Sequence, residues 1–215
     1  MAGTHAEPFH IAFLSLRERL QEGAYPPGAR ITAVDVADDL RLSTTPVREA
    51  LSRLAGQGIL EDQRGQGYFV ARLSAADVAD LYRMSLAALL ISQEPHRTSR
   101  RPPATPVEAE DVSASLGAVR DVEILFRDWA SDAGSRALTS TFRILQIQLG
   151  PVRRIEPLVF EDLDEEAQRL ARDSTGRPER LAQLRQFHGR RIRVAERLAS
   201  LLEASAPPRK KIERI

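Results

Sequence analysis

The sequence predicts a mainly α-helical protein, in which an N-terminal winged helix-turn-helix is followed by an all-α antiparallel helical bundle. Two observations support this fold class. Within the first 73 residues, three helical patterns precede two β-patterns that a glycine-rich turn separates. From residue 74 onwards, apolar residues recur at helical spacing almost to the end of the chain. We therefore expect a winged-helix domain in residues 1–73 and a helical effector-binding and dimerisation domain in residues 74–215.

Three helices are expected before the β-patterns. The first covers residues 8–21 and stops before a segment rich in glycine and proline. The second covers residues 32–40 and begins with the spacing of a capping box. The third begins at Ser43 or Thr45, and Pro46 is tolerated in its first turn because the backbone N–H groups there have no intrahelical acceptor.

A tight hairpin is expected to complete the first domain. Residues 59–63 and 68–71 read as two short strands, and Arg64-Gly65-Gln66-Gly67 joins them. Helix, helix, short turn, helix and a two-stranded wing make up the winged helix-turn-helix plan, in which the third helix lies in a major groove.

The rest of the chain is expected to form helices. A proline-rich tract, Glu94–Pro106, separates the first two of them, and Gly150-Pro151 ends the third. The expected helices cover residues 74–93, 107–129, 137–149, 161–172 and 178–204.

The third helix and the hairpin carry the functional prediction. The helix starts with short hydroxyl side chains and one arginine, which can hydrogen-bond to phosphates and base edges. Arg48 lies off the buried stripe and is the candidate for base readout, since a bidentate arginine contributes about 1–3 kcal/mol of discrimination. The glycines beside Gln66 allow close approach to a phosphate. The predicted DNA-binding residues are Arg30, Ser43, Thr44, Thr45, Arg48, Arg53, Arg64, Gly65, Gln66 and Gly67.

Simpler interpretations exist for each of these features. The hairpin can be an ordinary tight turn, and Arg48 can pair with Glu49, Ser52 or Asp62. Charge gives no support, because the first 73 residues hold 8 Arg against 9 Asp and Glu, a net charge of −1. The ordered set of elements is more specific than any single feature.

These residues resemble the GntR family of bacterial transcription regulators, most closely its FadR-like branch. The resemblance covers residues 9–72 and rests on the segments Tyr25–Ile31, Ser43–Leu51, Leu54–Gly58 and Arg64–Val70. It implies DNA binding as a two-fold dimer at a palindromic operator. The family often has arginine where Thr44 stands, and some members have a basic residue where Asp35 stands, which implies fewer charged contacts here.

In FadR-like members the bundle binds an effector, frequently a small carboxylate held with a metal by an aspartate and three histidines. Only His188 lies on an expected bundle helix, and Arg127 stands where the resemblance places a metal ligand, so we expect no metal and no cofactor. His188 lies on an apolar stripe of its helix. It is therefore either a core histidine or a ligand-binding histidine. Arg127 can instead pair with Glu123 at i,i+4. The candidate residues for an anionic effector are Arg127, Arg143, Arg185 and His188.

Other charged runs read as exposed. Arg153-Arg154, the acidic residues 161–166 and the basic residues 209–211 are each expected on the surface, the last in a tail. The sequence shows no pattern of a nucleophile with a base, of a phosphate-binding loop or of paired catalytic carboxylates. We therefore do not expect an enzyme.

Composition limits the remaining classes. The 215 residues contain no cysteine, which excludes thiol catalysis and zinc–thiolate sites. No apolar run reaches the roughly 18 residues of a membrane span, and the first residues lack the pattern of a signal peptide. We therefore expect a cytoplasmic, homodimeric repressor that binds double-stranded DNA and senses a small effector. The alternative is the same dimer with no effector, in which the bundle serves dimerisation or protein contacts.

Overall fold

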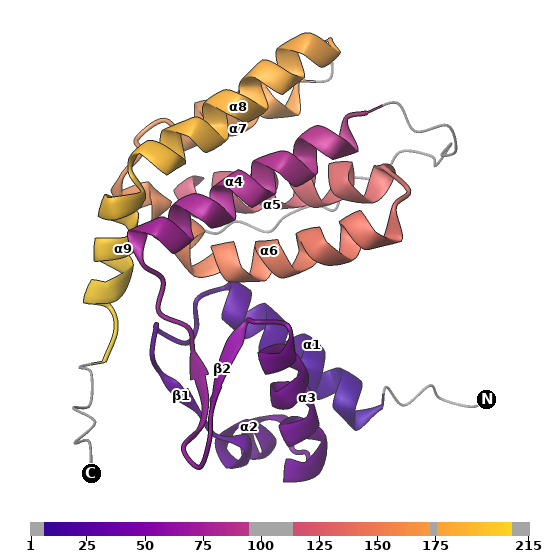
Figure 1. Ribbon diagram of the computed structural model, residues 1–215, viewed down its shortest axis with the longest axis vertical. Coiled ribbons are helices and arrows are strands. Elements are labelled where there is room, and N and C mark those ends of the chain that lie inside the picture. Colours follow the sequence, from indigo (N-terminus) through magenta and orange to yellow (C-terminus); the bar gives the residue numbers. More distant parts are fainter. Residues whose placement is uncertain (1–6, 95–113, 173–175, 208–215) are drawn as a thin grey trace.

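The computed structural model describes residues 7–94, 114–172 and 176–207. A small unit of helices and sheet lies below a layered set of longer helices, and the two are in contact (Figure 1). We call residues 7–73 the winged helix and the described residues from 74 onwards the bundle. The fold class expected from the sequence is confirmed.

The winged helix consists of three helices and three strands. Its elements are α1 (Pro8–Gln21), β1 (Arg30–Ile31), α2 (Ala33–Leu40), α3 (Thr44–Gly56), β2 (Leu60–Gln63) and β3 (Gly67–Val70). The helices pack through residues that repeat at helical spacing, among them Leu16, Val47 and Leu51, all with no exposed surface. The Thr32 hydroxyl caps α2 by accepting a hydrogen bond from the Asp35 amide, as the capping spacing predicts.

The turn between α2 and α3 depends on one left-handed residue. Arg41 ends α2 with φ 54° and ψ 44°, and it is the only non-glycine residue with positive φ in the described part of the chain. The Leu42 amide then donates to the Ala37 carbonyl over 2.9 Å, which closes the end of α2. This sharp turn sets the start of α3 at the edge of the domain.

The sheet contains a strand that the sequence analysis missed. Its order is β1-β3-β2, all antiparallel, with Arg30 opposite Phe69 and Glu61 opposite Phe69 on the other side. β1 has only two residues, too few to show alternation, so only its pairing partner reveals it.

The bundle consists of six α-helices and one 3₁₀ turn within its described residues. They are α4 (Ala75–Ser92), α5 (Ala114–Asp132), α6 (Arg136–Arg154), η1 (Glu156–Leu158), α7 (Leu163–Ala171), α8 (Arg177–Arg193) and α9 (Ala195–Ala204). Their apolar faces form one core that includes Phe126, Phe142, Leu149 and Leu184. None of the described helices is long and apolar enough to cross a membrane.

Two expected helix boundaries in the bundle were wrong. α6 continues through Pro151 to Arg154, because proline in this last turn removes one hydrogen bond while the buried neighbours Leu149 and Val152 keep the helix packed. The single helix expected over 178–204 is divided at Val194 into α8 and α9. Residues 95–113 lie outside the described residues. They include most of the expected proline-rich tract and the expected helix start at residue 107.

The winged helix and the bundle share a close contact between α1 and α6. A Cβ added to Gly150 would lie 2.1 Å from the Gln21 carbonyl oxygen, so only glycine allows this approach. Ile147 of α6 belongs to the core of the winged helix, and the Gln148 side-chain amide donates to the Gly58 carbonyl over 3.0 Å. The two units are therefore joined by packing as well as by the linker.

Candidate DNA-binding surface

The start of α3 presents free hydroxyl groups and free backbone donors. Ser43 occupies the N-cap position with extended backbone, φ −75° and ψ 159°, but its side chain makes no capping hydrogen bond. Ser43 and Thr45 are exposed and Thr44 is half-buried. The first N–H groups of a helix have no intrahelical acceptor and attract anions. The helix end is therefore open to a phosphate or a base edge.

Arg48 extends from the exposed face of α3. It lies one turn after Thr45, while Val47, Ala50 and Leu51 form the buried face. Arg48 forms no ion pair with any residue in the described ranges, so the expected alternative of pairing with Glu49 or Asp62 is not observed. Its guanidinium is available to an external acceptor.

A shallow hollow lies along this face. α3 forms its floor, and an aromatic residue from α1 and another from β3 also line it. The lining residues are Phe9, Arg48, Glu49, Ser52, Arg53 and Tyr68. Phe9, Ser52 and Tyr68 were not among the predicted site residues, because only the packing of α1 and β3 against α3 brings them together.

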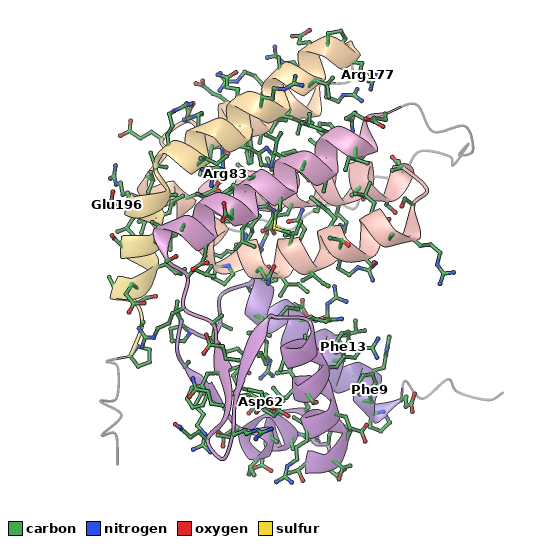
Figure 2. All side chains as sticks on the ribbon, viewed as in Figure 1. Phe9, Phe13, Asp62, Arg83, Arg177 and Glu196 are labelled. Atoms are coloured by element: carbon green, nitrogen blue, oxygen red, sulfur yellow. The ribbon has the colours of Figure 1, made fainter. Side chains whose placement is uncertain are left out.

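The wing has the conformation that its glycines predict. Gly65 and Gly67 have φ of +74° and +105°, values that favour glycine, and the Gln66 amide donates to the Gln63 carbonyl over 2.8 Å. Arg64, Gly65 and Gln66 are exposed at the tip, at the end of the hairpin that carries Asp62 (Figure 2). The wing thus projects from the same unit as α3.

Arg30 lies next to the wing rather than next to α3. It is exposed on β1, and its Nε atom is 3.4 Å from the position of a Cβ on Gly67. The structure therefore brings Arg30 and Gly67 together. Arg53 lies elsewhere, on the flank of α3 that faces α1, and its guanidinium carbon is 5.8 Å from the centre of the Phe13 ring.

The arginines expected to hold an effector lie on three different helices. Arg127, Arg143 and Arg185 are exposed and belong to α5, α6 and α8. The expected pair between Arg127 and Glu123 is wrong, because Arg127 has its nearest carboxylate at Asp128, 4.0 Å away. Glu123 is buried and points to α6 instead.

Different arginines are buried in the bundle. Arg191 of α8 is 1% exposed and donates to both carboxylate oxygens of Glu156 over 2.9 and 2.8 Å. Tyr82 also donates to Glu156, and Glu166 lies 2.8 Å from Arg191. Burial acts to lower the pKa of Arg191, but the charges of Glu156 and Glu166 together outweigh it, so the pKa is raised. All four groups are thus partnered inside the chain.

The pair Arg153-Arg154 is not exposed, contrary to expectation. Arg153 is 1% exposed and donates to the Gln146 side chain, and Arg154 donates to Glu123 over 2.8 Å. The two arginines lie at the end of α6. Sequence spacing alone does not show that they pair with Glu22, which follows α1, and with Glu123 of α5.

The acidic run at 161–166 is likewise only partly exposed. Glu166 is buried, and Asp162 accepts hydrogen bonds of 2.6 and 2.9 Å from Arg190. These hydrogen bonds lower the pKa of Asp162. The basic residues 209–211 lie outside the described residues.

His188 is a fully buried residue with two partners. Its Nε2 atom lies 3.1 Å from the Ser85 hydroxyl, and its Nδ1 atom lies 2.8 Å from the Leu184 carbonyl. Burial lowers its pKa to about 3, so the ring is neutral at pH 7. It packs against Phe126 and Phe187, in agreement with a core histidine.

The cavity among these buried charges has the size of one water molecule. It has a volume of about 10 Å³, and Arg153, Glu156, Glu166 and Arg191 contribute its polar lining. The described residues contain no group of three or more His, Cys, Asp or Glu that could hold a metal ion.

Comparison with known proteins agrees with this geometry. Residues 12–70 match the family described as "Bacterial regulatory proteins, gntR family". The chain is 42% identical over 60 residues to the Nta operon transcriptional regulator of Aminobacter aminovorans, which covers 28% of this chain and 29% of that protein. It is 32% identical over 83 residues to the HTH-type transcriptional regulator McbR of Escherichia coli, covering 37% and 38%. The matched segments span less than half the length of each relative.

The fold likeness extends further than the sequence likeness. The solved structure of E. coli McbR/YncC superimposes with a TM-score of 0.64 and 17% identity, covering 89% of this chain and 98% of that one. The bundle therefore shares a fold with McbR, whereas the family match covers residues 12–70.

Proposed function

We propose that this chain is a sequence-specific transcription regulator that binds a palindromic operator as a homodimer, because residues 12–70 match the gntR family of bacterial regulatory proteins. The observation that carries the proposal is the start of α3, where Ser43, Thr45 and Arg48 are exposed and Arg48 lines a hollow together with Tyr68 of β3. Such a helix enters a major groove and reads base edges. We assign residues 1–73 to this role and residues 74–215 to dimerisation.

Arg48 is the base-reading residue in this proposal. Its free guanidinium can donate two hydrogen bonds to a guanine edge. Ser43, Thr44 and Thr45 contact phosphates, and the wing residues Arg64–Gly67 with Arg30 contact the adjacent backbone or groove. Phosphate contacts position the domain, and Arg48 supplies the preference for sequence.

An exposed apolar stripe on α4 supports the homodimer. Met84 is 52% exposed and Ile91 49% exposed, and Ala87 lies between them on the same face. A second copy of the chain is the occupant we propose, because a symmetric pair places two recognition helices on two half-sites of one duplex. A dimer bound at a promoter blocks polymerase without further machinery, so we propose repression, in the cytoplasm and without enzymatic activity.

The bundle interior favours a dimer that acts without an anionic effector. Arg191 is already paired to Glu156 and Glu166, and the cavity beside them admits about one water. The exposed Arg127, Arg143 and Arg185 belong to three different helices. Effector sensing is the second candidate. Two buried nitrogen atoms of Arg153, Nε and Nη2, have no hydrogen-bond partner in the described structure, and they could donate to a small anion bound in the bundle.

Selection of bound duplexes from a random pool tests the proposed function. The purified full chain is expected to enrich a two-fold symmetric sequence with a guanine in each half-site and to run as a dimer in analytical ultracentrifugation. Enrichment of no sequence by a folded protein would contradict the proposal. A matched selection with Arg48→Ala should lose the guanine preference.

A further inference from the structure

One helix of the bundle is buried on two opposite sides. α6 is the bundle helix that lies against α1 of the winged helix (Figure 1). Phe142, Leu145 and Leu149 of α6 belong to the core of the bundle, whereas Ile147 belongs to the core of the winged helix. Ile144 also packs against the winged-helix core. α6 is therefore a structural part of both units.

The side of α6 that meets the winged helix follows the helical repeat. Its members recur at positions i, i+3, i+4 and i+7, which places them on one face. We call this face, made of Ile144, Ile147, Gln148 and Pro151, the joint face. Ile147 is 2% exposed, and the Gln148 side-chain amide donates to the Gly58 carbonyl over 3.0 Å. The joint face thus contacts the winged helix through apolar packing and a hydrogen bond.

The backbones of α1 and α6 approach closely at the border of the joint face. A Cβ on Gly150 would overlap with the carbonyl group of Gln21, and a Cβ on Gly23 would lie 3.6 Å from the Cα atom of Pro151. Relative motion is the usual expectation for two domains joined by a small polar interface. Here a rotation of the winged helix would press these backbones together or withdraw Ile147 from a close-packed core. These contacts therefore favour one orientation of the two units.

We propose that the joint face and Gly150 fix the winged helix on the bundle and thereby determine which spacing of operator half-sites the dimer accepts. The inference rests on the proposed function and adds a specificity determinant outside the winged helix. In a dimer joined through its bundles, the distance and angle between the two α3 helices depend on how each winged helix is held. Half-site spacing is then a geometric property of the dimer. A loose contact would let α3 follow a displaced half-site.

Duplexes with altered half-site spacing test the proposal. About two extra base pairs between the selected half-sites move one of them by roughly 7 Å and turn it by about 70° around the duplex axis. Wild type should bind this duplex more than about tenfold more weakly than the selected one, because one Arg48 loses its base.

Variants of α6 should lower this ratio of the two affinities. Gly150→Ala pushes α6 away from α1, and Ile147→Ala removes the side chain shared with the winged-helix core, so each should lower the ratio by roughly threefold or more. Partial unfolding weakens binding to both duplexes equally, so the ratio reports on the joint face and not on stability. Thr141→Ala is the matched control, because Thr141 is exposed on α6 two turns before Gln148, and it should keep the wild-type ratio.

A measurement without DNA separates this inference from the proposed function. The chain contains no cysteine, so Arg64→Cys in the wing and Arg185→Cys in α8, both at exposed positions, can carry two spin labels. Labelled chains are diluted with unlabelled ones, and pulsed electron paramagnetic resonance then gives the distribution of distances within one chain. Wild type and Thr141→Ala should give a narrow distribution, and Gly150→Ala and Ile147→Ala a broader one.

Two results would overturn the inference. A broad distribution in wild type, or an unchanged one in both joint variants, would show that these contacts do not hold the winged helix, whether or not selection yields an operator. Equal binding of wild type to both half-site spacings would show that the orientation does not determine the spacing.

Discussion

Arg154 of α6 donates a hydrogen bond to Glu22, the residue that ends α1, over 3.1 Å. The same Nη2 atom also donates to Glu123 of α5 over 2.8 Å, and Arg120 reaches Glu22 over 3.0 Å. These ion pairs join the winged helix to the bundle. Arg154 directly follows Arg153 in the chain, and Arg153 lines the internal cavity. The end of α1 is therefore held by Arg154, which also pairs with the buried carboxylate of Glu123 in the bundle.

Removing Arg154 should destabilise the protein. Arg154→Ala leaves Glu123, which is 7% exposed, without its shortest ion-pair partner, and breaking a buried pair in this way costs about 3 kcal/mol. Glu22→Gln should cost less than about 1 kcal/mol, because Glu22 is 36% exposed. Urea unfolding of both variants checks the order. An Arg154→Ala midpoint at or above that of Glu22→Gln would contradict the connection described here.

Removing the Glu156 carboxylate should be more costly than removing its tyrosine donor. Glu156→Gln leaves Arg191 buried with one carboxylate fewer, for which about 3 kcal/mol is expected. Tyr82→Phe removes one hydrogen bond while both arginine bonds remain, for about 1 kcal/mol. Thermal and urea denaturation of the two variants provide the measurement. Equal losses would mean that the ion pair contributes no more than the hydroxyl.

Stability should fall as the pH is lowered below 6.5. His188 is neutral in the folded protein because burial lowers its pKa to about 3, while in the unfolded chain its pKa is near 6.5. The unfolded state therefore takes up a proton first, and the contribution of His188 is present above pH 6.5 and lost as the pH falls towards 3. The expected loss at pH 5.5 is about 1.4 kcal/mol. His188→Gln should flatten the pH dependence between 7 and 5.5, and an unchanged slope in that variant would assign the effect to other groups.

Introducing charge on α4 should separate the dimer. Met84→Glu places a carboxylate on the stripe proposed to meet the second copy, so the dimer dissociation constant should rise by more than about tenfold, since an unpaired interfacial charge costs several kcal/mol. Leu158→Glu, at a residue 64% exposed on η1, is the control. Sedimentation velocity at several concentrations measures both. A Met84→Glu dimer as tight as wild type would place the interface elsewhere.

Local patterns sufficed for the helices and the hairpin of the winged helix, but they missed strand β1 and the charged interior of the bundle. The hairpin glycines and the capped helices are specified by neighbours a few residues away, so the sequence predicts them. Arg153, Arg191, Glu156 and Glu166 are buried because partners from distant helices receive them, and no spacing rule encodes such pairs. The same reason hid β1, whose two residues are defined by their pairing with β3 alone.

The most direct test of the account is a titration of wild-type protein and Arg48→Ala against fragments from the region upstream of its own gene, with nonspecific competitor present. Wild type is expected to bind one fragment saturably and more weakly at higher salt, while Arg48→Ala should lose about 1–3 kcal/mol of specific binding with an unchanged melting temperature. Equal binding by both proteins, or a lower melting temperature with binding intact, would show that Arg48 is structural and that α3 does not read the groove.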